Sequence, residues 1–298
     1  MSDLARHMSS PTKDGRLLDQ IGGGLFVLLA VLPILFAILF ALAYGLGLFG
    51  YFSKGFTTAH FMAVATGGEI IPAFLLSAYV AATTTLFTVG IGLWGALYLR
   101  RDLRTGPFSM LIYVPLILPS AVAGFSVWLL LGGAGLMSRL AFAVGLTTGS
   151  ADFPALVNDP FAIGIIAAHV GIGAPFFMIL FAQISQKEKT DRLASLSRAL
   201  GASPAQALLK IVIPVLLFRA RAQVVLSFIF VFGSFEIPAI LGSHSSEMIS
   251  VQAVRKLGML ELSQRPEAYV IACLYSLVVV LAVLFLMRSK PRPGPEQS

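Results

Sequence analysis

Long apolar runs separated by short polar segments dominate the pattern along this chain. Six of the runs reach about 20 residues or more, the length that an α-helix needs to cross a bilayer. They are expected over residues 21–49, 71–99, 107–131, 161–184, 221–242 and 266–287. The alternating ten-residue segments of an outer-membrane barrel are absent from the sequence. The pattern therefore predicts an all-α polytopic membrane protein with six transmembrane helices.

Composition agrees with this interpretation and predicts a single membrane domain. The chain has 298 residues, of which 57% are hydrophobic and only 12% are charged, whereas soluble domains carry roughly 25% charged residues. We expect an N-terminal tail over 1–20, one transmembrane domain over 21–287 and a C-terminal tail over 288–298. The first apolar run is longer than the roughly 7–15 residues of a cleavable signal sequence, so it is interpreted as an uncleaved first transmembrane helix.

The basic residues predict the orientation of the chain. The formal charge is +7, but lysine and arginine gather in short loops, which argues against nucleic acid as a partner. Of the 21, 16 fall in the two tails and in 100–106 and 185–221, whereas five fall in 50–70, 132–160 and 243–265. Because basic residues are enriched in cytoplasmic loops, both termini and the 185–221 segment are expected in the cytoplasm.

The polar segment 185–221 has strong signals for two short amphipathic helices. Leu193, Leu196 and Leu200 share one helical face. Gly201 suits the left-handed position that ends a helix. Ser203, Pro204 and Gln206 form the pattern of an N-cap, a first-turn proline and a capping box. The pattern predicts a sharp turn between two helices at Gly201–Pro204.

The second predicted helix places Ala205, Leu208, Leu209 and Val212 on one face. It is expected to be short and interrupted at Pro214, with Arg219 and Arg221 marking the return to the membrane. The two helices would form a compact projection with one apolar face. That face fits a socket on another protein, or an interfacial hairpin that lies on lipid headgroups. The sharp, capped turn favours the protein socket.

The same residues carry a resemblance to a known family. Gly201, nine further residues and then Ile211-Val-Ile-Pro214 resemble the cytoplasmic signature loop of ABC-importer permeases. That loop usually contains Glu-Ala-Ala before the glycine and Ile-x-Leu-Pro after it. Here the triplet is Ser195-Leu196-Ser197, and Ile213 replaces leucine. The missing carboxylate puts in doubt any ionic anchor that the family makes at this position.

The resemblance covers about residues 70–287 and implies the architecture of a type I importer permease. It implies that the loop is a coupling helix formed by Ser195, Leu196, Ser197, Gly201, Ala202, Ser203, Pro204, Leu208, Ile211 and Pro214. The implied partners are two cytoplasmic ATPases, a second permease that is identical or related, and a periplasmic solute-binding protein. The implied place is the bacterial inner membrane. The chain is expected to be non-catalytic and to bind no cofactor, while ATP and Mg²⁺ bind the partner ATPase.

The stretch "FGSFEIPAILG" at 232–242 resembles the branch that moves polyamines, sulfate, thiamine, ferric iron or phosphonates. It also contains Glu236, the only acid within the apolar parts of the predicted spans. An ionisable group at membrane depth is costly and by default marks a functional interior position. Glu236 is therefore a candidate pathway residue. The alternative is that it lies near the outer interface and caps a helix broken at Pro238.

Other patterns give weaker indications. Gly90-Ile-Gly92-Leu-Trp-Gly95 matches a dinucleotide fingerprint, but it lies inside an apolar span without a preceding strand. Close helix packing through small residues is the better interpretation. No nucleotide-binding P-loop motif occurs, so any ATP must be bound by another chain. His169 is interpreted as a hydrogen-bonding residue of the bundle interior, and Cys273 as a small core residue.

Two other functional classes stay as alternatives. A secondary transporter or channel driven by an ion gradient predicts several intramembrane charges and inverted repeats, whereas one acid and no convincing repeat are found. An intramembrane enzyme would need clustered carboxylates and histidines at one depth. Finally, residues 249–261 predict a short external helix with Ile249, Ala253, Leu257 and Leu260 on one face. It suits part of a gate, a docking surface or plain interfacial anchoring.

Overall fold

The computed structural model describes residues 22–50, 53, 55–99, 107–243, 245–259 and 262–288. Within these residues every regular element is a helix. Six helical stretches are long and apolar enough to cross a membrane: Gly22–Gly45, Ile70–Tyr98, Ser120–Ala143, Ile163–Lys187, Pro204–Phe232 and Leu262–Leu284. The predicted fold class is confirmed. Apart from Arg288, the predicted tails 1–20 and 288–298 lie outside the described residues.

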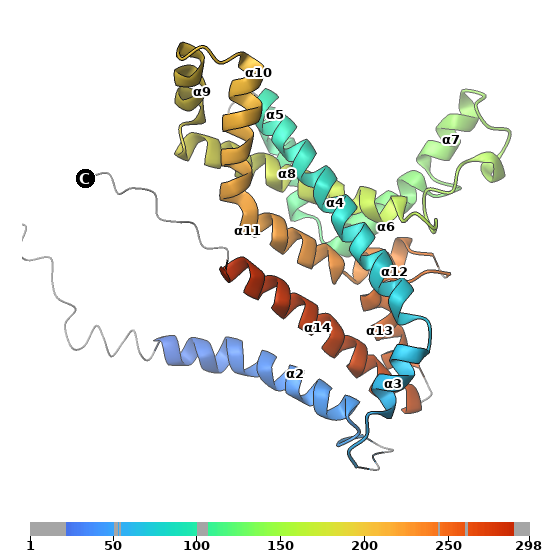
Figure 1. Ribbon diagram of the computed structural model, residues 1–298. Helices are drawn as coiled ribbons and strands as arrows, with labels where there is room; N and C mark the ends of the chain where they lie inside the picture. Colours follow the sequence, from blue (N-terminus) through green and yellow to red (C-terminus); the bar gives the residue numbers. More distant parts are fainter. Residues whose placement is uncertain are drawn as a thin grey trace, which may run out of the picture.

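The helices are numbered as in Figure 1. The α-helices are α2 (Leu32–Gly45), α3 (Ala59–Thr66), α4 (Ile70–Tyr98), α5 (Pro107–Ile117), α6 (Ser120–Leu131), α7 (Leu136–Ala143), α8 (Ile163–Lys187), α9 (Thr190–Ala199), α10 (Pro204–Ala207), α11 (Ile213–Phe232), α12 (Glu236–Leu241), α13 (Ile249–Gly258) and α14 (Arg265–Arg288). Two π-helical turns, η1 (Val27–Val31) and η3 (Leu208–Val212), precede α2 and α11. Two short 3₁₀ turns, η2 (Ser150–Asp152) and η4 (Leu262–Gln264), complete the order.

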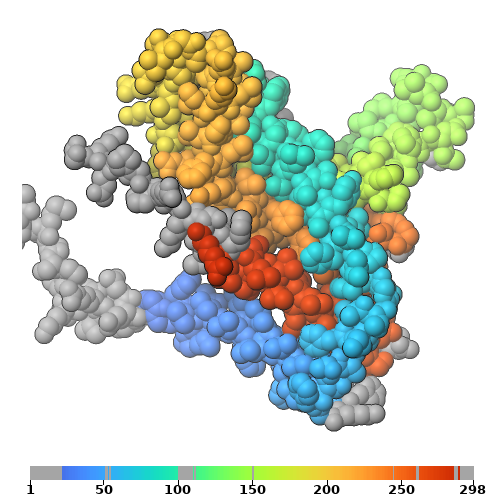
Figure 2. All heavy atoms as spheres, in the orientation of Figure 1, coloured from blue at the N-terminus to red at the C-terminus, as the bar shows by residue number. Residues whose placement is uncertain are grey.

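The long helix α4 forms the centre of the bundle and packs along α8 and α11. The short helix α12 packs on α6 and α8, while α14 packs on α2, α3 and α13. Helices α9 and α10 project from one end of the bundle, which we call the hairpin end, and α3 and α13 lie at the opposite end (Figure 1). Figure 2 shows the α9–α10 projection and α7 as two separate protrusions from the body.

Two apolar clusters hold the bundle together. The first lies toward the end opposite the hairpin and joins α4, α8, α12, α13 and α14 through residues such as Ile165, Phe232, Ile237, Ile249 and Val270. The second lies toward the hairpin end and joins α4, α8 and α11 through Phe177, Phe181 and Leu216. Because these side chains are almost fully buried within a single chain, both halves of the bundle are packed independently of any partner.

Small residues allow α4 and α8 to approach closely. A β-carbon on Gly92 would lie 2.5 Å from Phe177 Cβ, and one on Gly95 would lie 2.6 Å from the Met178 side chain. A β-carbon on Gly90 would meet nothing within 4 Å. Two of the three glycines of this pattern, Gly92 and Gly95, therefore serve helix packing, the interpretation favoured by their position inside an apolar span.

The fifth helix differs from its prediction. Instead of a short helix ended by Pro214, residues Pro204–Phe232 form one continuous helical stretch. The turn before Pro214 widens into the π-turn η3, whose Ile213 N–H donates to Leu208 O. A widened turn is one way in which a helix adapts to a proline ring that would clash with a carbonyl of the preceding turn. The same arrangement precedes Pro33, where Leu32 N–H donates to Val27 O in η1.

The predicted span 221–242 is broken after Phe232. Residues Gly233–Phe235 leave the helix, and α12 begins at Glu236. A β-carbon on Gly233 would overlap the Tyr275 hydroxyl of α14, so a larger residue would require the Tyr275 side chain to move. Pro238 has no N–H to offer to the carbonyl of Ser234 four residues earlier. The Ser250 hydroxyl of α13 donates to that carbonyl instead.

The predicted span 107–131 is also divided. It forms α5 and α6, which are separated at Leu118–Pro119 because a residue before proline is restricted away from the helical conformation. Helix α6 ends at Leu131, and the chain resumes as α7 after Gly132–Gly135. Helices α6 and α7 together form the apolar stretch Ser120–Ala143, which is long enough to cross a membrane.

The predicted helix 249–261 corresponds to α13, which is fixed by polar contacts. Ile249 is buried and its N–H donates to Ser77 Oγ at 2.9 Å. Leu257 is exposed, and Leu260 lies outside the described residues. A charged cluster joins α13 to the starts of α4 and α14; it consists of Glu69, Glu247, Arg255, Lys256 and Glu267. A hydrogen bond from Gln252 is the main cause of the lowered pKa of Glu69.

The α4–α8 contact gives a test of the fold. Gly92→Ala should destabilise the protein by about 1–3 kcal/mol, because the added methyl group overlaps the backbone of α8. Gly90→Ala is the matched control, since the same change two residues away meets open space and gains helix propensity. Thermal unfolding in detergent should show a lower Tm for Gly92→Ala alone. Equal Tm values for the two variants would contradict the close contact.

Candidate functional site

The hairpin of α9 and α10 is built as the sequence predicts. Gly201 has φ +94°, a conformation that other residues adopt with strain. The preceding helix ends with hydrogen bonds from Gly201 N–H to Arg198 O and from Ala202 N–H to Ser197 O, both 3.0 Å. This is the Schellman arrangement of a helix C-terminus. The turn direction is thus fixed by the backbone itself.

A capping box then starts the next helix. Gln206 N–H donates to Ser203 Oγ at 3.2 Å, and Ser203 N–H donates to Gln206 Oε1 at 2.9 Å. Pro204 occupies the first turn. A cap of this kind contributes roughly 1 kcal/mol. The predicted capping box is confirmed, and both sides of the turn are rigidly defined.

The hairpin exposes large apolar side chains. Leu196 is 62% exposed, Leu200 82% and Leu209 63%. Leu196 lies in α9, Leu200 at its end and Leu209 in η3. The α9–α10 projection stands clear of the bundle in Figures 1 and 2. The hairpin thus combines a capped, polar turn with three exposed leucines.

The other candidate residues of the hairpin have different surroundings. Ser195 is exposed and its hydroxyl donates to Asp191 O, while the buried Ser197 donates to Ala194 O. Leu208 packs partly against the second apolar cluster, next to the buried Val212. The exposed leucine of this turn is therefore Leu209, which the sequence pattern did not distinguish from Leu208.

Ile211 and Pro214 lie farther along the chain than the tip of the hairpin. Ile211 is part of the π-turn η3, and Pro214 is in the first turn of α11. They belong to the connection between the hairpin and the bundle. The structure thus separates the candidate residues into those around the turn between α9 and α10, some exposed and some buried, and Ile211 and Pro214 in the helical base.

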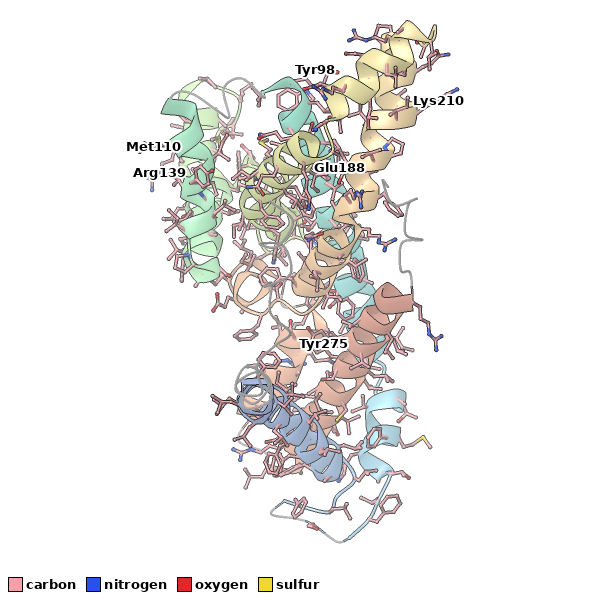
Figure 3. All side chains as sticks on the ribbon, turned by 90° about the vertical axis from the view of Figure 1, so that its left-hand side faces the viewer. Tyr98, Met110, Arg139, Glu188, Lys210 and Tyr275 are labelled. Atoms are coloured by element: carbon pink, nitrogen blue, oxygen red, sulfur yellow. The ribbon has the colours of Figure 1, made fainter. Side chains whose placement is uncertain are left out.

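Polar contacts at the base hold the hairpin to the bundle. Arg219 on α11 makes a bidentate ion pair with Glu188, with Nε 3.0 Å from Oε1 and Nη2 3.1 Å from Oε2. Glu188 follows α8 at the start of the turn into α9, and Figure 3 shows it below the hairpin on which Lys210 projects outward. The buried hydroxyls of Ser185 and Thr190 lie 2.5 Å apart across the same turn.

The ion pair escaped the sequence analysis because its partners are 31 residues apart and belong to no motif. It joins the end of α8 to α11 beside the hairpin. A cavity of about 280 Å³ lies between the end of α4 and the hairpin, lined by Tyr98, Ala194, Arg198, Pro204 and Leu208 among others. The hairpin is therefore separated from the end of α4 by this cavity, while Leu208 packs against the bundle.

Glu236, the other candidate, lies far from the hairpin on α12. It is exposed, as are Phe235 and Ala239, whereas Ile237, Pro238 and Leu241 face the bundle and are buried. No hydrogen bond or ion pair reaches Glu236 within the described part of the chain. It begins the helix that follows the break at Gly233–Phe235.

His169 and Cys273 lie within the spans, away from the hairpin. His169 is buried, and its Nδ1 lies 2.9 Å from Ile165 O of the same helix. Cys273 is partly buried. Among the described residues no group of three or more histidine, cysteine or acidic side chains could hold a metal ion.

Comparison with known proteins shows which family the chain resembles in sequence. The model of the binding-protein-dependent transport system inner membrane component matches residues 88–289. The probable ABC transporter permease protein y4fN of Sinorhizobium fredii is 28% identical over 211 residues, which make up 69% of this chain and 35% of that relative. The chain thus spans about 35% of the length of this curated relative.

Solved structures share the fold at low identity. A bacterial ABC transporter involved in the import of the acidic polysaccharide alginate has a TM-score of 0.67 and 17% identity, with 92% of each chain covered. A bacterial alginate ABC transporter in complex with an alginate pentasaccharide-bound periplasmic protein has a TM-score of 0.66 and 17% identity, with 91% of this chain and 90% of that chain covered. Because the family model matches more than half of the sequence, the chain belongs to the family of binding-protein-dependent transport system inner membrane components, the ABC transporter permeases.

Proposed function

We propose that this chain forms the translocation pathway of an ATP-driven importer and is coupled to a separate ATPase through the α9–α10 hairpin. The observation that carries the proposal is the exposed apolar turn around Gly201, held rigidly by the caps on both of its sides. Lipid contact alone does not require such a fixed turn. A socket on a second protein would bury Leu196, Leu200 and Leu209 together.

The continuous stretch Pro204–Phe232 supports a mechanical role for the hairpin. Its 29 residues span about 43 Å at 1.5 Å per residue. Displacement of the hairpin is thus passed directly to the break at Gly233–Phe235 near Glu236. In this proposal ATP binding closes two ATPases, the hairpins move with them, and the pathway alternates between inward and outward access.

The remaining parts of the assembly follow from the family. A second permease, identical or related, would complete the pathway, and a periplasmic solute-binding protein would deliver the solute. The similar alginate transporter was crystallised with such a periplasmic protein, which supports this partner. ATP and Mg²⁺ would bind the ATPase, and the permease would carry out no covalent chemistry. The polyamine, sulfate, thiamine, iron and phosphonate branch supplies the candidate solutes.

Orientation can be tested directly. Reporter fusions after Ser298 and within 132–160 should report opposite sides of the membrane, because most basic residues lie on the side of the termini and the hairpin. A third fusion between α9 and α10 should report the same side as Ser298. Finding the hairpin and the 132–160 loop on one side would contradict the proposed coupling.

The coupling turn gives the second experiment. Gly201→Val should abolish co-purification of the ATPase, since a β-branched residue is strained at positive φ. The matched control is Gly145→Val, because Gly145 has φ +75° and similarly open surroundings but lies beyond α7. Leu209→Asp should also abolish ATPase binding, because it places a charge on an apolar contact that would be buried in the complex.

All three variants should insert into the membrane in normal amounts. Loss of membrane contact by the hairpin with unchanged ATPase recovery would favour the lipid-lying alternative. Full recovery of the ATPase with both hairpin variants would reopen the ion-gradient transporter as the function of the chain.

The ion pair at the base tests whether the hairpin and the bundle move together. Glu188→Arg and Arg219→Glu should each retain the ATPase but reduce solute uptake per ATP hydrolysed, because each leaves two like charges facing one another. The double variant restores opposite charges and should recover much of the solute uptake per ATP hydrolysed. Stability should change little, since exposed pairs contribute about 1 kcal/mol or less. A double variant no better than either single variant would remove the pair from the mechanism.

A further inference from the structure

The exposed face of α12 combines one carboxylate with apolar neighbours. Phe235, Glu236 and Ala239 are exposed on this face, while the opposite face packs on α6 and α8. Gly124 of α6 approaches Ile237 and Ile240 closely, so the orientation of α12 is fixed. The Glu236 carboxylate is therefore held away from the packed interior of this chain.

The break before α12 lies farther into the bundle than the charged cluster of Glu69, Glu247, Arg255, Lys256 and Glu267. The Phe232 ring stacks on Tyr275 at 5.8 Å and contacts Phe74 edge-on at 5.2 Å. Phe74 is five residues beyond Glu69 and Tyr275 eight beyond Glu267, which corresponds to about 7 and 12 Å along their helices. At such a depth an ionised side chain is costly against lipid. The α12 face is expected to meet water or another permease subunit instead.

Among the described residues no ion pair reaches the negative charge of Glu236. Arg255 and Lys256 are engaged by Glu69, Glu247 and Glu267. Arg219 and Arg221 precede Glu236 by at least 15 residues, about 22 Å along a helix. The C-terminal end of α11, with its partial negative charge, points to the same break. The Ser234 hydroxyl there has no hydrogen-bond partner within the described residues.

We propose that the exposed face of α12 is a water-accessible, cation-attracting part of the pathway, and that the transported solute is positively charged. The inference rests on the proposed permease function and narrows its solute class. Among the candidate solutes it favours amines, thiamine and metal cations. It disfavours sulfate, phosphonates and acidic saccharides, which a lone carboxylate repels.

A thiol probe on the same face measures this potential without knowledge of the solute. Ala239→Cys is introduced in a Cys273→Ser background, which removes the single native cysteine. The protein, assembled with its ATPase in membrane vesicles, is treated separately with a trimethylammonium and a sulfonate methanethiosulfonate reagent of similar size. The ratio of the two modification rates reports the local charge.

Adding Glu236→Gln should lower the cation-to-anion rate ratio about tenfold at low salt. Side chains three residues apart on a helix are roughly 6 Å apart, where one charge in water alters each rate about threefold in opposite directions. Glu69→Gln is the matched control and should leave the ratio unchanged, because its carboxylate belongs to the charged cluster. An unchanged ratio in Glu236→Gln, or no reaction with either reagent, would overturn the proposal.

Solute class is tested by protection of the same thiol from an uncharged methanethiosulfonate reagent. 1,4-Diaminobutane, a minimal dication, should slow modification at least threefold, whereas sodium sulfate at equal ionic strength should not. Equal protection by both, or by neither, would overturn the assignment of a cationic solute. The thiol assay and ATPase co-purification are independent readouts. Failure of coupling and failure of cation attraction are therefore distinguishable.

Discussion

Backbone groups without a hydrogen-bond partner determine where the fifth helix continues and where it breaks. In lipid every N–H and C=O must be paired within the protein, and a proline removes one donor. At Pro214 the preceding turn widens and the helix continues. At Pro238 the orphaned carbonyl of Ser234 is instead taken by Ser250 of α13. The second solution needs a neighbouring helix, and it produces the break that exposes Glu236.

The difference between these two prolines explains the limits of prediction from sequence. Helices α4 and α14 follow from apolar length alone, because no proline lies in their interiors. Helix α8 also follows from its apolar length, and it continues through Pro175. The hairpin turn is also local, since Gly201 and the Ser203 cap act within six residues. In contrast, whether the helix continues or ends at Pro214 depends on the hydrogen-bond geometry of the whole preceding turn. The break at Gly233–Phe235 depends on Ser250, a residue of another helix that lies 16 residues from Ser234 in the sequence.

The site residues show the same difference between features set by the local sequence and features set by contacts between helices. The exposed leucines were predictable as a set from their spacing, but only the packing of Leu208 against the second apolar cluster shows that Leu209 is the outward one. Glu188 and Arg219 carry no motif, and their pairing depends on how α8 and α11 cross. Where the family usually has a carboxylate, this chain has Ser195-Leu196-Ser197. The ion pair found near the hairpin is a contact within the chain, between Glu188 and Arg219 at the base.

Rigidity at both ends of the Pro204–Phe232 stretch gives this helix its role in the proposed cycle. At one end the capping box and the Glu188–Arg219 pair fix the helix to the turn that would meet the ATPase. At the other end Gly233 fits against Tyr275, and α12 is clamped on α6. Leu216 and Val212, on both sides of Pro214, are buried in the second cluster. In the proposed cycle a displacement of the hairpin would therefore be carried along the helix to the contact between Gly233 and α14, where the backbone leaves the helix shortly before Glu236.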